Sequence, residues 1–127
     1  MHIIKNKLFT IFLLAIIGLK GYSQATQKLK INEYSCANVS GTGVYQDAFG
    51  NTPDWFEIYN PNTSAVNLSG YYVSNDPTNV SKWQFPSDPS VNIPAKKCIV
   101  VYASGRNTVI YGAQNEYHTN FDLLQTK

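Results

Sequence analysis

Asp54-Trp55-Phe56-Glu57-Ile58-Tyr59-Asn60-Pro61 is the stretch of this sequence that decides its fold. Aromatic and β-branched residues are enriched in strands, so residues 54–59 predict a β-strand. Period two places Phe56 and Ile58 on one face of this strand, and places Trp55, Glu57 and Tyr59 on the other. Because Asn and Pro favour turns, residues 60–62 end the strand.

Short segments of the same character lie on both sides of this strand, separated by clusters of Gly, Pro and Asn. They predict further strands, with a long loop at residues 36–52 and a connection at 87–95. The run 98–102 is continuously apolar, which is typical of a central strand buried on both faces. No helical periodicity follows the first twenty-odd residues, so the fold class is an all-β antiparallel sandwich or barrel. The other expected strands are 29–34, 65–68, 71–74 and 82–85, with extra pairing from 109–111 and 118–123.

The first part of the chain has the pattern of a cleavable signal peptide. Lys5 and Lys7 precede an apolar run, residues 8–19, which is shorter than the ~20 residues that span a bilayer. Small residues favour cleavage after Ser23, with cleavage after Ala25 as the alternative. We therefore expect a signal peptide at 1–23, a flexible tail at 24–28 and a single domain at 29–127, secreted or on the cell surface. No second long apolar run follows, so we expect no membrane span in the mature chain.

Charge is sparse in this sequence. Charged residues make up 14% of the chain and the formal net charge is +2, with several of the basic residues inside or just after the expected leader. The mature domain is therefore near neutral, which argues against a basic surface for nucleic acid.

Export permits a disulfide, and Cys36 and Cys98 are the only two cysteines. A bridge between them would stabilise the fold by about 4 kcal/mol in the loop-entropy account. The alternative is that both are small buried apolar residues.

Six segments, read in order, resemble the lamin tail domain family. They are residues 31–33, 54–61, 66–76, 82–86, 100–105 and 118–121, and the resemblance covers residues 29–127. It implies an immunoglobulin-like antiparallel β-sandwich, in the branch found in exported bacterial proteins. There the domain is a non-catalytic binding or structural module beside secreted nucleases, phosphatases and surface proteins. The residues that carry the resemblance are Asn32, Glu33, Asp54, Trp55, Glu57, Asn60, Pro61, Leu68, Ser69, Gly70, Asp76, Trp83, Phe85, Pro86, His118, Asn120 and Phe121.

One departure from the family pattern concerns the end of the chain. Family members usually continue past the His-Thr-Asn-Phe motif with a Gly-containing turn and a final strand or hairpin. This sequence stops at Lys127, so we expect either a fragment of a longer protein or a domain that lacks its last strands. An uncovered edge would offer unpaired backbone groups to another chain.

The obvious catalytic patterns are absent from the sequence. Ser40, Ser69 and Ser104 each precede a glycine, but none lies in a Gly-x-Ser-x-Gly elbow, so all three are interpreted as turn residues. His118 has no Cys-x-x-Cys pair beside it, which argues against zinc and favours a hydrogen-bonded structural histidine.

Acidic residues leave two further hypotheses. Glu33 and Glu57 lie on expected strands and could act as acid and base or bind a hard cation, or they could simply accept hydrogen bonds at the sandwich edge. Calcium binding by loop acids is the remaining cofactor hypothesis, although no Asp-x-Asp-x-Asp-Gly spacing supports it. Those loop acids are Asp47, Asp54, Asp76 and Asp88.

Aromatic residues are the remaining candidates for a binding surface. Trp55, Tyr59, Tyr72 and Trp83 could bind a partner protein or a cell-surface glycan, or they could pack in the core. The sequence thus predicts a secreted, non-catalytic interaction or structural module without a cofactor. The alternatives are an accessory domain of a secreted nuclease or phosphatase whose catalytic part lies beyond Lys127, and a carbohydrate-binding module.

Overall fold

The computed structural model describes residues 27–39 and 44–123. The predicted signal peptide, residues 1–23, lies outside them. Within these ranges all regular secondary structure is β-strand, which confirms the all-β fold class. The strands are β1 (Lys30–Ser35), β2 (Asp54–Tyr59), β3 (Val66–Asn67), β4 (Tyr72–Val73), β5 (Trp83–Gln84), β6 (Asn92–Ile93), β7 (Cys98–Ala103), β8 (Thr108–Ile110) and β9 (Glu116–His118).

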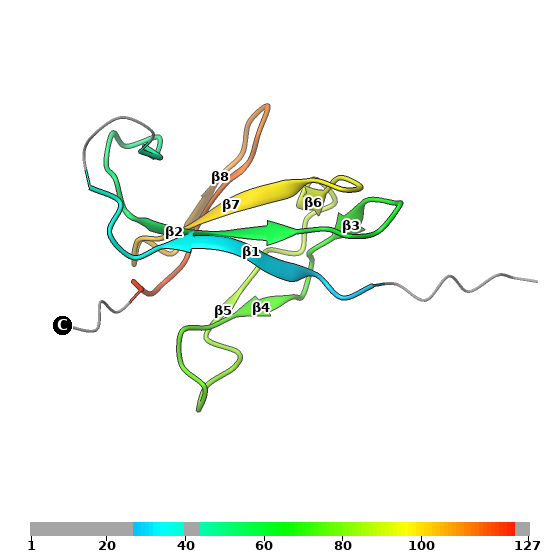
Figure 1. The fold of residues 1–127 in the computed structure, drawn as a ribbon, viewed down its shortest axis with the longest axis horizontal. Coiled ribbons are helices and arrows are strands. Elements are labelled where there is room, and N and C mark those ends of the chain that lie inside the picture. Colours follow the sequence, from blue (N-terminus) through cyan, green and yellow to red (C-terminus); the bar gives the residue numbers. More distant parts are fainter. Residues whose placement is uncertain (1–26, 40–43, 124–127) are drawn as a thin grey trace, which may run out of the picture.

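The strands form one large and two small sheets that enclose a single core. The five-stranded sheet has the order β1-β2-β7-β9-β8, and the pairs β3-β6 and β4-β5 form two-stranded sheets. Figure 1 shows β1, β2 and β7 running side by side across the molecule. The small sheets and their flanks contribute side chains such as Leu68, Phe85 and Ile93, which pack against Phe56 and Val101 of the large sheet. Two layers around one core make an immunoglobulin-like sandwich.

Strand β2 follows its predicted bounds and its predicted alternation. Phe56 lies opposite Val101 and Ile58 opposite Ile99, and both side chains of β2 are buried in the core. The aromatic and apolar pairs of β2 and β7 therefore build the core face of the large sheet.

Antiparallel pairing is not universal in the large sheet. β9 runs parallel to β7, with Val101 opposite Tyr117 and Tyr102 opposite His118. β8 is antiparallel to β9 and takes the outer position. After β7 the chain skips one position in the sheet and forms β8 as the outer strand. It then turns back to form β9 in the position between β7 and β8, and β9 therefore runs parallel to β7.

Three further expectations need correction. β6 lies inside the predicted connection 87–95. β7 is not buried on both faces along its whole length, because Cys98 is exposed and β9 pairs only with its later residues. The flexible tail predicted over 24–28 is wrong at Gln27, whose backbone N–H donates to Asn62 Oδ1 at 2.6 Å and whose carbonyl accepts from Asn62 Nδ2 at 2.9 Å.

The Asn60 side chain ties the end of β2 to the second layer. Asn60 is fully buried, and its Nδ2 donates to Ser64 O at 2.9 Å and to Ile93 O at 3.0 Å. Its Oδ1 accepts from the backbone N–H and the side-chain Nδ2 of Asn62. Buried backbone groups at this corner are thereby satisfied by one amide.

Candidate functional site

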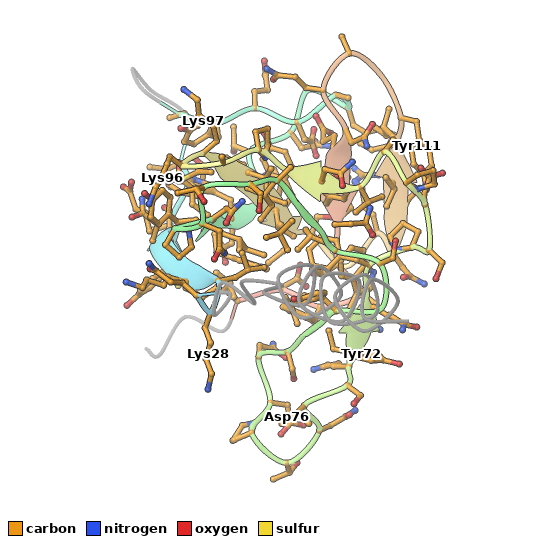
Figure 2. The ribbon with its side chains drawn as sticks, turned by 90° about the vertical axis from the view of Figure 1, so that its right-hand side faces the viewer. Lys28, Tyr72, Asp76, Lys96, Lys97 and Tyr111 are labelled. Atoms are coloured by element: carbon orange, nitrogen blue, oxygen red, sulfur yellow. The ribbon has the colours of Figure 1, made fainter. Side chains whose placement is uncertain are left out.

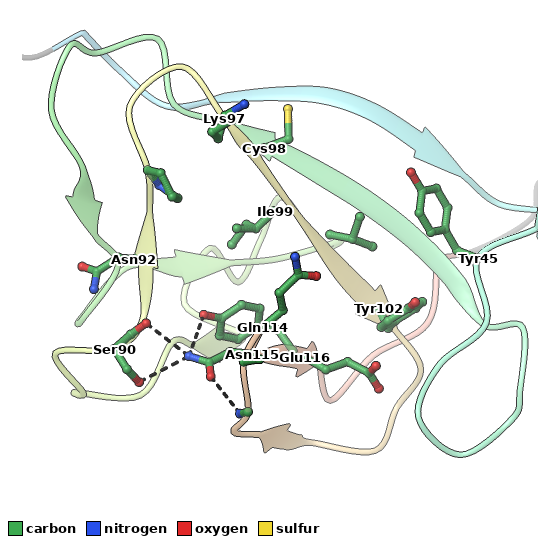
Figure 3. Close-up of a pocket in the computed structure, with 15 residues that line it drawn as sticks. Tyr45, Ser90, Asn92, Lys97, Cys98, Ile99, Tyr102, Gln114, Asn115 and Glu116 are labelled. Carbon is green, nitrogen blue, oxygen red and sulfur yellow. Dashed lines mark hydrogen bonds between the residues drawn. The ribbon is translucent and has the colours of Figure 1, made fainter.

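A large groove runs along one edge of β7. Its volume is about 910 Å³, and Figure 3 shows it bounded by β7, by the β6 segment and by residues 112–116. Alternate residues of a strand point to opposite faces, yet Cys98, Ile99 and Val100 all line it. A groove lined from both faces of a strand must follow the edge of that strand.

The β7 edge is open there because β9 covers only part of it. β9 pairs with Val101 and Tyr102, and the N–H of Thr119 donates to Tyr102 O at 2.9 Å. Residues two apart direct their backbone groups to the same edge of a strand. The N–H of Val100 and both backbone groups of Cys98 therefore point to the side where the groove lies.

The far wall of the groove is polar and is held in place by Asn115. The Asn115 Nδ2 donates to Ser90 O at 3.2 Å, and its Oδ1 accepts from the N–H of Gly112 at 3.3 Å, as drawn in Figure 3. Asn92 and Gln114 add side-chain amides to the lining. The wall thus presents hydrogen-bonding groups towards an apolar floor that includes Ile99.

The two ends of the groove carry opposite charges. Lys97 lines one end and follows Lys96, which adopts a φ of 58° in the turn before β7. Figure 2 shows both lysines at the same end of the molecule. Glu116 and Tyr45 line the other end. A bound molecule would therefore meet a cation at one end and a carboxylate at the other.

The segment 44–51 is fastened at the Glu116 end by three contacts. The Tyr102 hydroxyl donates to Gln46 O at 3.0 Å, and the N–H of Ala48 donates to Glu116 at 2.9 Å. Phe49 packs edge-on against His118, with ring centroids 5.5 Å apart. Burial, and next the nearby carboxylate of Glu116, raise the pKa of Tyr102 to about 12.

The structure also brings Ser104, His118 and Glu116 into one hydrogen-bonded chain. Ser104 Oγ lies 2.9 Å from His118 Nδ1, and His118 Nε2 lies 2.7 Å from Glu116 Oε1. His118 is fully buried, and Ser104 Oγ also accepts from the N–H of Arg106 at 3.4 Å. The β7 groove is lined by Glu116 but by neither Ser104 nor His118. This hydrogen-bonded chain joins the residue after β7 to β9.

No disulfide joins Cys36 to Cys98 in the described residues, so this prediction is corrected. Ser35 lies opposite Trp55 and Trp55 opposite Tyr102, whereas Cys98 lies opposite Tyr59. The two cysteines thus lie at opposite ends of the sheet, about 13 Å apart along the strands alone. A disulfide requires Cα atoms within about 7 Å.

The predicted aromatic surface is largely wrong. Trp55 and Trp83 are only 6% and 5% exposed, and Tyr59 is half-buried. Trp55 lies on the outer face of the sheet, where the ring of Tyr45 covers it at a centroid distance of 4.7 Å. Tyr72 alone of the four is exposed, at 49%.

None of the acidic candidates lines the β7 groove, although the Glu57 side chain lies next to Cys98. Glu33 lies directly opposite Glu57, and Asn32 Nδ2 donates to Glu57 at 2.9 Å, which is the edge hydrogen bond of the plainer interpretation. Hydrogen bonds from the Thr78 hydroxyl and N–H lower the pKa of Asp76. Within the described ranges no group of three or more His, Cys, Asp and Glu side chains is placed to hold a metal ion.

Asp47 and Asp54 are also turn or strand-end residues. Asp47 Oδ1 accepts from the N–H groups of Phe49 and Asn51, at 3.0 and 2.7 Å. Burial and then the charge of Asp122 raise the pKa of Asp54. The calcium hypothesis therefore gains no ligand set from these residues.

A second groove, of about 530 Å³, opens between β1 and the smaller β4-β5 sheet. Its lining is mostly apolar and includes Ile31, Tyr34, Val73 and Leu123. Ile31 and Tyr34 are exposed on the edge strand β1.

Many of the residues that carry the family resemblance lie in the core or in turns, where they stabilise the fold. Asn60, Leu68, Trp83, Phe85, His118 and Phe121 are buried, and Gly70 has a φ of +83° in the turn before β4. By contrast, the polar residues of the β7 groove were not singled out from the sequence. Lys97, Gln114 and Asn115 belong to no motif, and only the three-dimensional pairing of β7 with β9 marks them.

These features define an immunoglobulin-like β-sandwich domain with an open strand edge inside a groove. The model of the Lamin Tail Domain family matches residues 22–126, and the chain belongs to this family. Domains of the family are immunoglobulin-like and usually serve as non-catalytic interaction modules. No curated protein and no solved structure matches the chain. Residues 27–39 and 44–123 contain no helix that is long and apolar enough to cross a membrane.

Proposed function

We propose that this chain is a non-catalytic interaction module of an exported protein and that it binds its partner in the β7 groove. The observation that carries the proposal is the open edge of β7, because it exposes main-chain groups next to an apolar floor and a polar wall. Such an edge is the usual site of peptide addition to a sheet. His118 of the Ser104–His118–Glu116 chain is fully buried, and neither His118 nor Ser104 lines the β7 groove, which supports a role without catalysis.

A polypeptide is the partner favoured over a glycan. Trp55 and Trp83 are buried in the sandwich, and Tyr72, the exposed member of the four predicted aromatics, does not line the groove, where Tyr45 is the exposed ring. The groove instead offers amide side chains and strand backbone, which suit main-chain hydrogen bonds.

The proposed function is tested by mapping where ligands bind. The purified protein is screened against a displayed random-peptide library and a glycan array, and the best binder is titrated into ¹⁵N-labelled protein. The amide signals of residues 97–100 and 112–116 should shift, while those of 72–73 and 83–84, in the β4-β5 sheet, should not. Binders that all map away from the groove would contradict the proposal. So would a hydrolase activity of the purified protein that Ser104→Ala abolishes.

Export and context are tested separately. Mass spectrometry of the exported protein should show an N-terminus directly after Ser23 or Ala25, and retention of residues 1–23 would contradict export. Reading the coding sequence past Lys127 distinguishes a free-standing module from an accessory domain of a nuclease or phosphatase, since only the latter continues into a catalytic domain.

A further inference from the structure

We propose that the partner segment is an extended, acidic stretch of polypeptide that adds to β7 as a short strand. This inference rests on the proposed function and specifies the chemistry of the ligand. It uses three features of the groove: the direction of the β7 backbone groups, the length of the open edge and the charges at its end.

The backbone groups of β7 favour strand addition over other ways of filling the groove. The carbonyl of Tyr102 already pairs with β9 through Thr119, and the groups of Val100 and Cys98 face the same side. Because β9 starts at Glu116, the position beside Cys98–Val100 in the sheet is vacant in the described chain. An added strand in that position would extend the line of β9.

The vacant edge is short. It extends from Cys98 to Val100, because both backbone groups of Lys97 already pair with Pro94 and Asn60; this corresponds to about 10 Å at ~3.3 Å per residue. Asn92 and Asn115 line the groove opposite this edge and hold its wall in place through their own hydrogen bonds, and Gln114 adds a further side-chain amide to the lining. About three residues of the partner therefore pair with this edge in extended form.

Basic side chains gather where this edge begins. Lys96 and Lys97 are exposed in the turn before β7. Lys30 lies opposite Tyr59, which lies opposite Cys98, so the same end of the sheet carries a third exposed lysine. Glu57 faces Val100 but accepts a hydrogen bond from Asn32. Charge complementarity thus calls for a carboxylate on the segment near Lys97.

The test uses a synthetic peptide of alternating glutamate and valine, with a matched peptide of alternating lysine and valine. Titration into ¹⁵N-labelled protein should shift the amide signals of Cys98 and Val100 with the acidic peptide, and the basic peptide should bind at least about tenfold more weakly. Lys97→Gln should weaken the acidic peptide about threefold to fivefold, the range of one exposed ion pair. Gln84→Glu, on the exposed surface of β5, changes the net charge equally and should leave the affinity unchanged.

Main-chain pairing is tested on the peptide itself. N-methylation of every second peptide amide removes the donors of one edge, so one methylation pattern should weaken binding about tenfold and the alternate pattern should not. Equal affinity of both patterns, or of both peptides, overturns strand addition by an acidic segment. Binding of a glycan in the groove without peptide binding overturns this inference and leaves the proposed function intact. If every ligand, the acidic peptide included, shifts signals outside the groove only, both are overturned.

Discussion

Replacing Asn60 by alanine is the sharpest test of how the sandwich is held together. Asn60 lies at the end of the stretch that decides the fold and is fully buried. The substitution removes the donors to Ser64 O, Ile93 O and Pro94 O and the acceptor of two Asn62 groups. Alanine can replace none of these interactions.

The magnitude follows from the buried partners. Each hydrogen bond contributes about 1 kcal/mol net, and a partner left buried without a bond costs about 1–3 kcal/mol. The Ile93 carbonyl is the most enclosed partner, while water can reach Ser64. We therefore expect Asn60→Ala to lower the free energy of unfolding by about 3–5 kcal/mol. That is a large share of the ~5–15 kcal/mol of an ordinary domain.

The assay is urea unfolding followed by the fluorescence of the two buried tryptophans. Asn67→Ala is the matched control, because Asn67 Nδ2 also donates to three acceptors but at an exposed position. The control should lose about 1 kcal/mol or less, since water replaces its partners. If the two variants lose similar stability, or if Asn60→Ala loses less than about 1 kcal/mol, the reasoning from burial is refuted.

Three further predictions concern the groove and its surroundings. Burial and nearby carboxylates raise the pKa of Tyr102 to about 12 in the folded state. The stability that the protonated hydroxyl contributes is therefore present below the unfolded pKa of about 10 and is lost as pH rises towards 12. In Tyr102→Phe the urea midpoint should depend less on pH over this range, and an unchanged dependence would contradict the assignment. Glu116→Ala removes the acceptor of the Ala48 N–H, so hydrogen exchange of that amide should accelerate about tenfold, and unchanged protection would show that Glu116 does not fasten the segment. Burial and then Glu57 raise the pKa of the exposed Cys98 thiol, so Glu57→Gln should lower that pKa and speed alkylation at pH 8, as followed by mass spectrometry; an equal rate would count against this contact.

Local pattern was sufficient to predict the elements whose neighbours are close in sequence or strongly alternating. The strand 54–59 combines clear alternation with a turn of Asn and Pro, and its bounds match those of β2. β6 is only two residues long and lies between Pro89 and Pro94, so it is too short to show the alternation of a strand. The parallel entry of β9 depends on which strand fills the gap beside β7, and no local signal encodes that choice.

The errors at the candidate site have one cause: they concern packing between distant segments. Trp55 has the outward position that alternation assigns to it, but Tyr45 from the long loop covers it. The even number of cysteines is compatible with one disulfide, yet the register places Cys36 and Cys98 at opposite ends of the sheet. The groove exists because the pairing of β9 with β7 does not extend to Cys98. The sequence at 112–116 contains no motif that predicts where this pairing ends.

The interruption in the pairing of β1 with β2 has a consequence for stoichiometry. The register shifts between Ile31 and Glu33, so the outer edge of β1 is not a regular template for a further strand. Bulged edges of this kind oppose edge-to-edge association. The irregular β1 edge therefore closes its own end of the large sheet, while the open part of β7 lies inside a groove. Two copies of this domain should not pair through their β1 edges.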